Sequence, residues 1–258
     1  MRVEFVSTLN KFNNQKLQII GCKSFSVRLP IYLKEDEILK LDLSNTFVSL
    51  NKIMHQRDIS NLESFISKLG DAKGIIFSDL SVFQIAKRYN LTHKLIYDPQ
   101  TLITNVMELK FWEEMNIYGI FVSPFIRIDE LLSFKSSLKI FFIGYGYLPL
   151  FYSKRKLITN YCMHNNIAYE NLIDNKDLYL KEELRDGKYK IIEDENGTHV
   201  FTPYIFNASK YLDEITNIDY LVLDYNFIDE DFYDRFINKV YNANECDGFL
   251  SQKIIYKK

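Results

Sequence analysis

A basic and aromatic segment at residues 141–157 is the part of this sequence best suited to chemistry. It is predicted to begin as a buried strand, to run into a loop marked by Gly144 and Gly146, and to end in a turn with three consecutive cations. Tyrosines next to cations can stack on unpaired bases while the cations neutralise phosphate groups. The alternative is that the tyrosines pack inside the protein and the cations are a solvated helix start. The residues concerned are Tyr145, Tyr147, Tyr152, Lys154, Arg155 and Lys156.

Polar residues at the ends of predicted strands are a second set of candidates. In a barrel of parallel strands the carboxyl ends share one mouth, so these side chains would converge there. The alternative for each is a helix cap or a turn. Asp79 and Asp98 could approach each other at such a mouth and act as a general acid and base. The full set is Asn51, Lys52, Asp79, Asp98, Ser123 and Asp224.

Standard catalytic and metal-binding signatures are absent from the sequence. There is no GxSxG, no HExxH and no glycine-rich phosphate loop. The four histidines lack metal-ligand spacing, and His55, just beyond a predicted strand end, is the first to test. Cys22, Cys162 and Cys246 are odd in number and far apart, which argues against disulfides and against a zinc or iron–sulfur site made by this chain alone. We therefore expect no metal in this chain and a reducing, cytoplasmic location.

The composition is that of an ordinary globular protein. A chain of 258 residues can bury one sizeable core. A formal net charge of −2 gives no global field to attract nucleic acid or an anionic membrane, so any contact with a polyanion would be local. The longest apolar stretch, residues 138–152, contains Lys139 and a proline and falls short of the roughly 18 residues of a membrane helix. We expect no contact with a membrane.

Short β-branched or aromatic runs alternate with helical stretches along most of the chain, as is typical of βα units. The runs lack polar alternation, which indicates strands of a parallel sheet covered on both faces. Helices are predicted at residues 59–69, with a Ser60-x-x-Glu63 capping box, at 105–115, with Asn105 as N-cap, and at 232–240. The predicted strands are residues 17–21, 25–29, 47–51, 74–79, 95–98, 119–124, 139–144 and 219–224.

The pattern changes at residues 168–206, which are rich in charge. Asn196-Gly197 predicts a hairpin between strands at residues 189–192 and 198–201. No linker rich in Pro, Ser or Gly separates this region from the rest. We therefore predict one domain over residues 1–258 with a polar β insertion at about 168–206. The acidic run 229–231 is predicted as the first turn of the last helix, and the tail 248–258 could add a short strand.

Several segments resemble, in the same order, the collagenase-like peptidase family U32. This resemblance implies a TIM-like (β/α)8 barrel, either closed or incomplete, since residues 168–206 interrupt the repeat. The likeness is greatest to short members that lack an iron–sulfur cluster and accompany a longer paralogue in tRNA 5-hydroxyuridine formation. The segments that carry it are residues 25–29, 49–52, 74–79, 104–112, 144–161, 193–197 and 248–250.

The family pattern also differs from this sequence at two important positions. Longer members have two cysteines that help to hold an iron–sulfur cluster, and the corresponding residues here are Pro149 and Lys156. Neither can supply a thiolate, so the resemblance implies that this chain binds no cluster. A second departure is Pro124-Phe125, where many relatives have an Arg-Glu pair.

The resemblance therefore implies a non-cluster partner subunit in prephenate-dependent hydroxylation of the tRNA wobble uridine. Its expected partners are tRNA and a longer, cluster-bearing paralogue. One alternative is a peptidase, as the family name says, for which Ser153 is the only candidate nucleophile. Another is a catalytically inactive interaction scaffold. The substrate-binding residues implied are Arg28, Asn51, Lys52, Asn105, Tyr145, Tyr147, Ser153, Lys154, Arg155, Lys156 and Tyr161.

Overall fold

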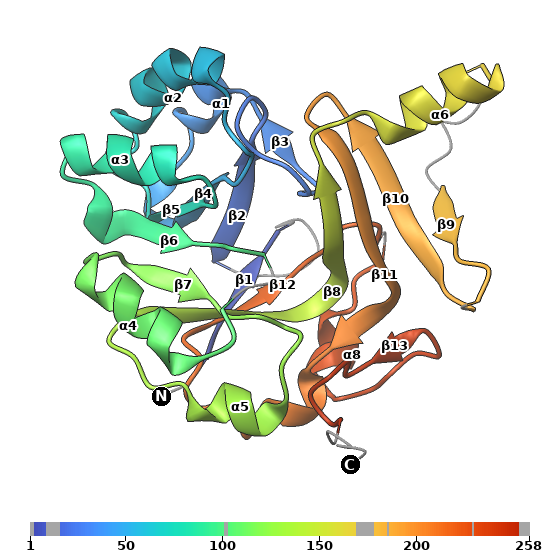
Figure 1. Cartoon of the computed structure of the whole chain (residues 1–258). Helices are drawn as coiled ribbons and strands as arrows, with labels where there is room; N and C mark the ends of the chain where they lie inside the picture. Colours follow the sequence, from blue (N-terminus) through green and yellow to red (C-terminus); the bar gives the residue numbers. More distant parts are fainter. Residues whose placement is uncertain are drawn as a thin grey trace.

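Eight parallel strands close into a barrel, with helices packed around its outside (Figure 1). The computed structural model describes residues 3–8, 16–100, 103–168, 178–184, 186–228 and 230–252. The barrel closes because its last strand pairs in parallel with both the first and the seventh. The predicted TIM-like (β/α)8 fold is confirmed, in its closed form. In chain order the barrel strands are β1 (Glu4–Ser7), β2 (Leu17–Cys22), β4 (Thr46–Leu50), β5 (Gly74–Phe77), β6 (Leu95–Tyr97), β7 (Gly119–Phe121), β8 (Lys139–Ser153) and β12 (Tyr220–Leu223).

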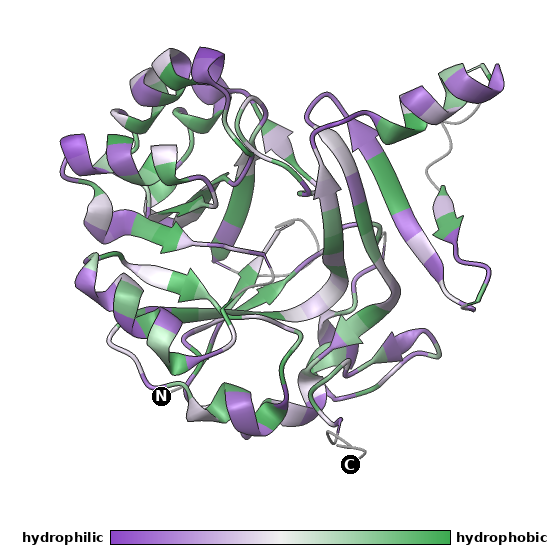
Figure 2. Ribbon diagram, viewed as in Figure 1, coloured by the Kyte–Doolittle hydropathy of each residue, from purple (hydrophilic) through white to green (hydrophobic). Residues whose placement is uncertain are grey.

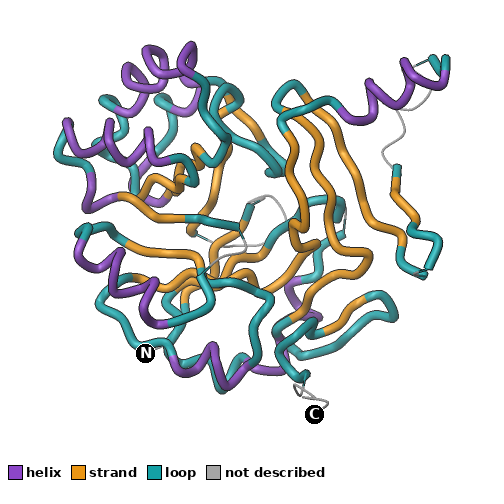
Figure 3. Tube along the Cα trace, viewed as in Figure 1, coloured by secondary structure: helices purple, strands orange, loops and turns teal. Residues whose placement is uncertain are grey.

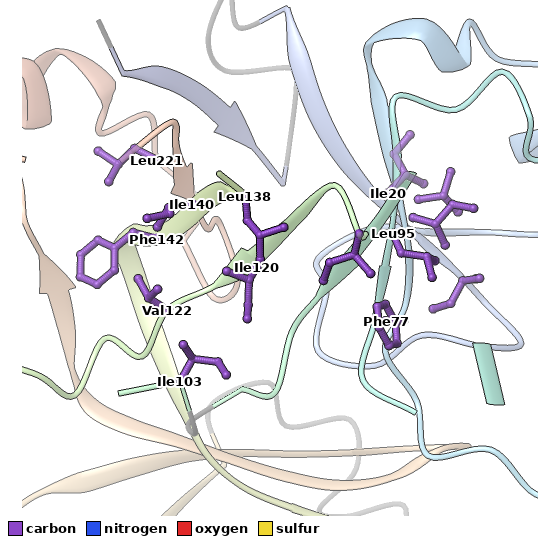
Figure 4. Close-up of a cluster of buried hydrophobic side chains, with 14 of the residues drawn as sticks. Ile20, Phe77, Leu95, Ile103, Ile120, Val122, Leu138, Ile140, Phe142 and Leu221 are labelled. Carbon is purple, nitrogen blue, oxygen red and sulfur yellow. The ribbon is translucent and has the colours of Figure 1, made fainter. Parts of the chain in front are cut away.

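Side chains of the barrel strands alternate between the barrel interior and the layer under the helices, because the side-chain period of a strand is two. In Figure 2 these strands are largely hydrophobic, whereas the outer sides of the helices carry hydrophilic residues. Outward side chains such as Ile120, Ile140 and Leu221 belong to the layer under the helices (Figure 4). Burial on both faces explains the continuous apolar runs in the sequence. The inner core consists of Val6, Leu17, Ile19, Phe47, Ile76, Ile96, Phe121, Phe141, Tyr220 and Val222.

Two of the predicted helix starts can be compared directly with the structure. Asn105 Oδ1 accepts hydrogen bonds from two N–H groups of the first turn of α4 (3.0 and 3.2 Å), as predicted. The cap predicted at Ser60 is wrong, because the 3₁₀ turn η2 (Gln56–Asp58) leads directly into α2, which begins at Ile59. The described helices are α1 (Glu35–Ile38), α2 (Ile59–Ile66), α3 (Leu80–Arg88), α4 (Val106–Glu114), α5 (Ile128–Ser133), α6 (Leu157–Asn165) and α8 (Tyr233–Ile237).

Strand β8 continues well beyond the barrel and carries a strand-rich extension, opposite the helices of the first half of the chain (Figure 3). It runs through both glycines and Pro149 to Ser153, so the expected glycine-punctuated loop is wrong. The reason is that β11 pairs with it in antiparallel orientation and supplies backbone hydrogen-bond partners. The predicted hairpin is confirmed, since β10 and β11 pair across a two-residue turn. The strands of this extension are β9 (Tyr179–Lys181), β10 (Lys188–Asp194) and β11 (Gly197–Asn207).

Other predicted elements differ from the structure. Residues 25–29 form a loop over the barrel mouth rather than a strand, and Arg28 has a φ of +61° there, which no strand residue adopts. The sequence pattern did not indicate β1. Helix α8 begins after the acidic run, of which residue 229 lies outside the described residues. Residues 248–252 form turns that follow the short strand β13 (Glu245–Cys246), and residues 253–258 lie outside the described residues. Within the described ranges, no helix is long and apolar enough to cross a membrane.

Candidate functional site

A cavity of about 70 Å³ opens at the carboxyl ends of the barrel strands. Its floor is formed by inward side chains of the inner core, and polar residues from the strand ends and loops form its wall. Pro149 of β8 and Phe201 of β11 bring the extension into the lining. Enzymes with this fold have their active sites at this end of the barrel. The floor consists of Ile19, Ile76, Phe121 and Val222, and the polar wall of Thr8, Arg28, Ser49, Asn51, Asp98, Gln100 and Asp224.

The loop that carries Arg28 is fixed to the barrel mouth by hydrogen bonds from three sides. Asn51 Oδ1 accepts a hydrogen bond from the backbone N–H of Val27 (2.9 Å), and Asn226 Nδ2 donates one to the carbonyl of Arg28 (2.6 Å). From the extension, Asn196 Nδ2 donates to the carbonyl of Ser26 (3.1 Å). The left-handed backbone of Arg28 costs on the order of 1–3 kcal/mol, and such strain persists where the surroundings impose it, often at functional sites.

Arg28 is the cation that the described residues contribute to the cavity. Only 7% of its surface is exposed, and its Nε has no hydrogen-bond partner among the described residues. Burial lowers its pKa, while the negative charges of Asp98 and Asp224 act in the opposite direction. A buried guanidinium N–H that makes no hydrogen bond is costly, so this group is suited to receive an anionic ligand.

Asp98 and Asp224 are the carboxylates of the same cavity. Burial raises the pKa of Asp224 to about 6, although its Oδ1 accepts hydrogen bonds from a backbone N–H (3.0 Å) and from Thr8 Oγ1 (3.1 Å). Burial also raises the pKa of Asp98, opposed by the charge of Arg28 and by a hydrogen bond from the Gln100 N–H (2.9 Å). Asp224 is therefore able to exchange a proton near neutral pH.

Tyr152 and His199 lie on the extension and are electrostatically coupled to Arg28. Their rings stack with centroids 4.7 Å apart. His199 is fully buried, and among the described residues neither ring nitrogen has a hydrogen-bond partner; its Nε2 is 3.9 Å from Asp194 Oδ1. Burial lowers the pKa of His199 and raises that of Tyr152 to about 12, so both are neutral at physiological pH.

The structure brings part of the predicted set together. Arg28, Asn51, Asp98 and Asp224 all line the cavity. Ser123 lies beside it in a smaller pocket that also contains Asp98.

Other predicted residues are held in structural contacts. Lys52 Nζ donates to the carbonyl of Ser24 (2.6 Å) and is 3.6 Å from Asp58. Asp79 caps α3 by accepting from the Ser81 N–H (2.9 Å), and Asn105 caps α4.

Two of the three tyrosines of β8, Tyr145 and Tyr147, pack within the protein. Tyr145 is 1% exposed, its hydroxyl donates to Glu245 Oε1 (2.5 Å), and its ring stacks on Phe232 (3.6 Å between centroids). Tyr147 meets Phe227 edge to face at 5.8 Å. Neither tyrosine lines the cavity, so this arrangement matches the packing alternative that the sequence left open.

The cationic turn after β8 lies near the loops of the mouth. Lys154 Nζ donates to the carbonyl of Ile53, which follows β4 (2.5 Å). Arg155 and Lys156 are exposed, and Tyr161 on α6 is 58% exposed. Ser153 Oγ accepts from the Arg155 N–H (3.1 Å), and no histidine or carboxylate of the described residues is hydrogen-bonded to it. His55 is likewise exposed, at the start of η2.

The donor set does not fit an iron–sulfur cluster. Pro149 lines the cavity wall, and Lys156 precedes α6 on the surface. Cys22 and Cys162 are buried, and burial raises the pKa of Cys22 to about 12, which disfavours the thiolate. In the described part of the chain, no three His, Cys, Asp or Glu side chains are grouped so that they could hold a metal ion.

The sequence did not single out two residues that shape this site. Thr8 follows the unpredicted strand β1, and its Oγ1 both donates to Asp224 and accepts from the Tyr225 N–H (2.9 Å). Asn226 ties the Arg28 loop to the end of β12. Neither residue belongs to a recognisable motif, although Asn226 lies only two positions after a predicted strand end.

Comparisons with known proteins give consistent results. The model of peptidase family U32 matches residues 19–226. Among curated proteins, tRNA hydroxylation protein P2 of Bacillus subtilis (strain 168) is 26% identical over 197 residues, which cover 72% of this chain. The match covers 64% of that relative's length. Among solved structures, the U32 peptidase Mk0906 superposes with a TM-score of 0.51 at 11% identity, covering 87% of this chain and 93% of that one. The structural likeness supports the fold alone.

Proposed function

This chain belongs to peptidase family U32, and on that basis we propose that it takes part in hydroxylation of the tRNA wobble uridine. It acts there as a cytoplasmic partner subunit, in a prephenate-dependent reaction whose oxidation step is performed by a longer, cluster-bearing paralogue. The observation that carries the proposal is the similarity over 197 residues to a tRNA hydroxylation protein.

The surface next to the barrel mouth supports a role in RNA binding. Arg155 and Lys156 are exposed, and Lys154 ties this turn to the loop after β4. Cations placed there neutralise RNA phosphates while the exposed ring of Tyr161, on the following helix, is available for a base. The net charge of −2 fits a local contact of this kind better than a broad electrostatic one.

The residues of the cavity support the role of a partner rather than that of an independent oxidase. Positions 149 and 156 hold Pro and Lys, and no thiolate is available there. The polar wall of the cavity contains an arginine, two carboxylates and two amides, which can bind an anion and move a proton but cannot carry electrons.

Gene deletion tests the proposal. Nucleoside mass spectrometry of tRNA from the deletion strain is expected to show loss of 5-hydroxyuridine at the wobble position, with recovery when the gene is restored. Restoring an Arg155→Glu/Lys156→Glu variant is expected to give incomplete recovery, because two phosphate contacts become repulsive.

The matched control is Lys68→Glu/Lys87→Glu, which makes the same charge change at two other exposed positions, one in the turn after α2 and one on α3. This control should restore the modification fully. An unchanged level of wobble 5-hydroxyuridine in the deletion strain would contradict the proposal.

A further inference from the structure

We infer that the cavity at the barrel mouth is a binding site for a small organic carboxylate, with Arg28 as its counter-ion. The inference deepens the proposed function, on which it rests only for the identity of the natural ligand. It is carried by the geometry of the cavity and can be tested without RNA.

The first argument is the state of Arg28. A guanidinium group has five N–H donors. When an arginine is as buried as Arg28, which is 7% exposed, these donors ordinarily make hydrogen bonds within the protein. Here Nε has no partner among the described residues, and Asp98 and Asp224 act on the group through charge rather than through hydrogen bonds. Asn51 and Asn226 fix the backbone of this loop in a strained conformation. The protein therefore holds an unsatisfied Nε–H donor on a residue that lines the cavity, and a carboxylate can accept from this group and from a terminal N–H of the same guanidinium.

The second argument is the charge balance, which favours a carboxylate over a phosphate. Among the described residues, Arg28 is the only cation that lines this cavity, and two aspartates line it as well. The other titratable groups that interact electrostatically with Arg28 are Tyr32, Tyr152 and His199. Burial raises the pKa of both tyrosines and lowers that of the histidine, so all three are neutral at physiological pH. A monoanionic carboxylate beside one arginine is tolerable when one aspartate is protonated. With one aspartate protonated, the charges of Arg28 and of the other aspartate cancel, so a bound carboxylate leaves one buried negative charge and a phosphate dianion would leave two.

The third argument is the shape and polarity of the floor. Ile19, Ile76, Phe121 and Val222 present an apolar surface below the polar wall. A cavity of about 70 Å³ exceeds the roughly 10–15 Å³ that one water molecule requires. A carboxylate with a small apolar body matches this arrangement, because its charged end meets Arg28 and its carbon body covers the floor.

Binding of an anion at this site is coupled to proton uptake. Asp224 is held by Thr8 and Asn226, and burial raises its pKa to about 6. A second negative charge in the cavity raises that pKa further, so the complex takes up a proton when it forms above pH 6. Affinity should then fall as pH rises from 6 to 8, by up to about tenfold per pH unit.

Isothermal titration of the purified full chain tests the inference. The probes are acetate and benzoate, with acetamide and benzamide as neutral analogues of the same shape and inorganic phosphate as the competing anion, measured at pH 6 and at pH 8, where phosphate is mainly a dianion. The expected result at pH 6 is saturable binding of at least one carboxylate and no binding of its amide. Arg28→Gln should weaken that binding at least tenfold, whereas Arg88→Gln, a change at an exposed arginine of α3, should leave it unchanged.

Several results would overturn the inference. They are binding of phosphate as tight as that of the best carboxylate, equal binding of acid and amide, retained affinity in Arg28→Gln, or no binding of any carboxylate. If Arg28→Gln does not fold, the comparison of acid with amide on the native protein still decides. Loss of wobble 5-hydroxyuridine on gene deletion, together with no carboxylate binding, would reject the inference and leave the proposed function standing.

Discussion

Replacing Asp224 by asparagine should stabilise the protein at alkaline pH, although it removes a charged residue from the candidate site. Asparagine has the same shape, and its Oδ1 can still accept from Thr8 Oγ1 and from the Asn226 N–H. What the substitution removes is the cost of keeping a carboxylate charged in a buried cavity.

The size and sign of the effect follow from the pKa of Asp224. Burial raises it from 3.8 to about 6 in the folded protein, so the folded state holds this proton more tightly than the unfolded chain. The cost is fully present above pH 6, declines as pH falls through 6, and is gone below about pH 4. A difference of about two pH units at 1.36 kcal/mol each sets an upper limit of about 3 kcal/mol at pH 8, reduced by solvent that reaches the cavity.

Urea denaturation at pH 8 and at pH 4 measures this effect. The expected result is a higher free energy of unfolding for Asp224→Asn at pH 8, little difference at pH 4, and equal m-values. Asp71→Asn, the same change at an exposed residue, serves as the control and should show no such gain. Lower stability of Asp224→Asn at pH 8, or an identical gain at both pH values, would refute the assignment of Asp224 as a carboxylate destabilised by burial.

Three further substitutions test how the frame of the site is built, each by urea denaturation. Gly146→Ala should cost on the order of 1–3 kcal/mol, because φ is +133° and the new Cβ would lie 2.7 Å from the Asp224 carbonyl; an unchanged midpoint would show that β8 can move there. Tyr145→Phe should cost about 1–3 kcal/mol by leaving buried Glu245 without one donor, and a neutral result would mean that this hydrogen bond is dispensable. Asn105→Ala should cost about 1 kcal/mol through loss of the α4 cap, whereas retention by Asn105→Asp would confirm the capping role.

Sequence patterns predicted the barrel because its strands are buried on both faces. Strands such as β5 and β12 are runs of apolar residues, and this local signal needs no knowledge of the partner strands. The end of β8 could not be predicted in the same way. Its two glycines and Pro149 indicate a loop, and they are extended only because β11, about 50 residues later in the chain, pairs with them. The loop at residues 25–29 resembles a strand in sequence because its apolar side chains Phe25 and Val27 are buried, as those of a strand would be.

The candidate site was partly predictable for a similar reason. Asn51, Asp98 and Asp224 follow buried strands, and the common direction of parallel strands places their side chains at one mouth. The orientation of Arg28 depends on a left-handed backbone imposed by Asn226, nearly 200 positions away, and no local pattern encodes that contact. The tyrosines of β8 are ambiguous in sequence, because only the packing of α8 decides that Tyr145 faces Phe232 and Glu245.

The most direct test of the central claim is complementation of the deletion strain with Arg28→Gln, followed by quantification of wobble 5-hydroxyuridine. The account predicts that the native gene and Arg88→Gln restore the modification, and that Arg28→Gln, present at the same abundance, does not. Full restoration by Arg28→Gln would contradict the claim that the barrel mouth is the working site of this protein in tRNA hydroxylation.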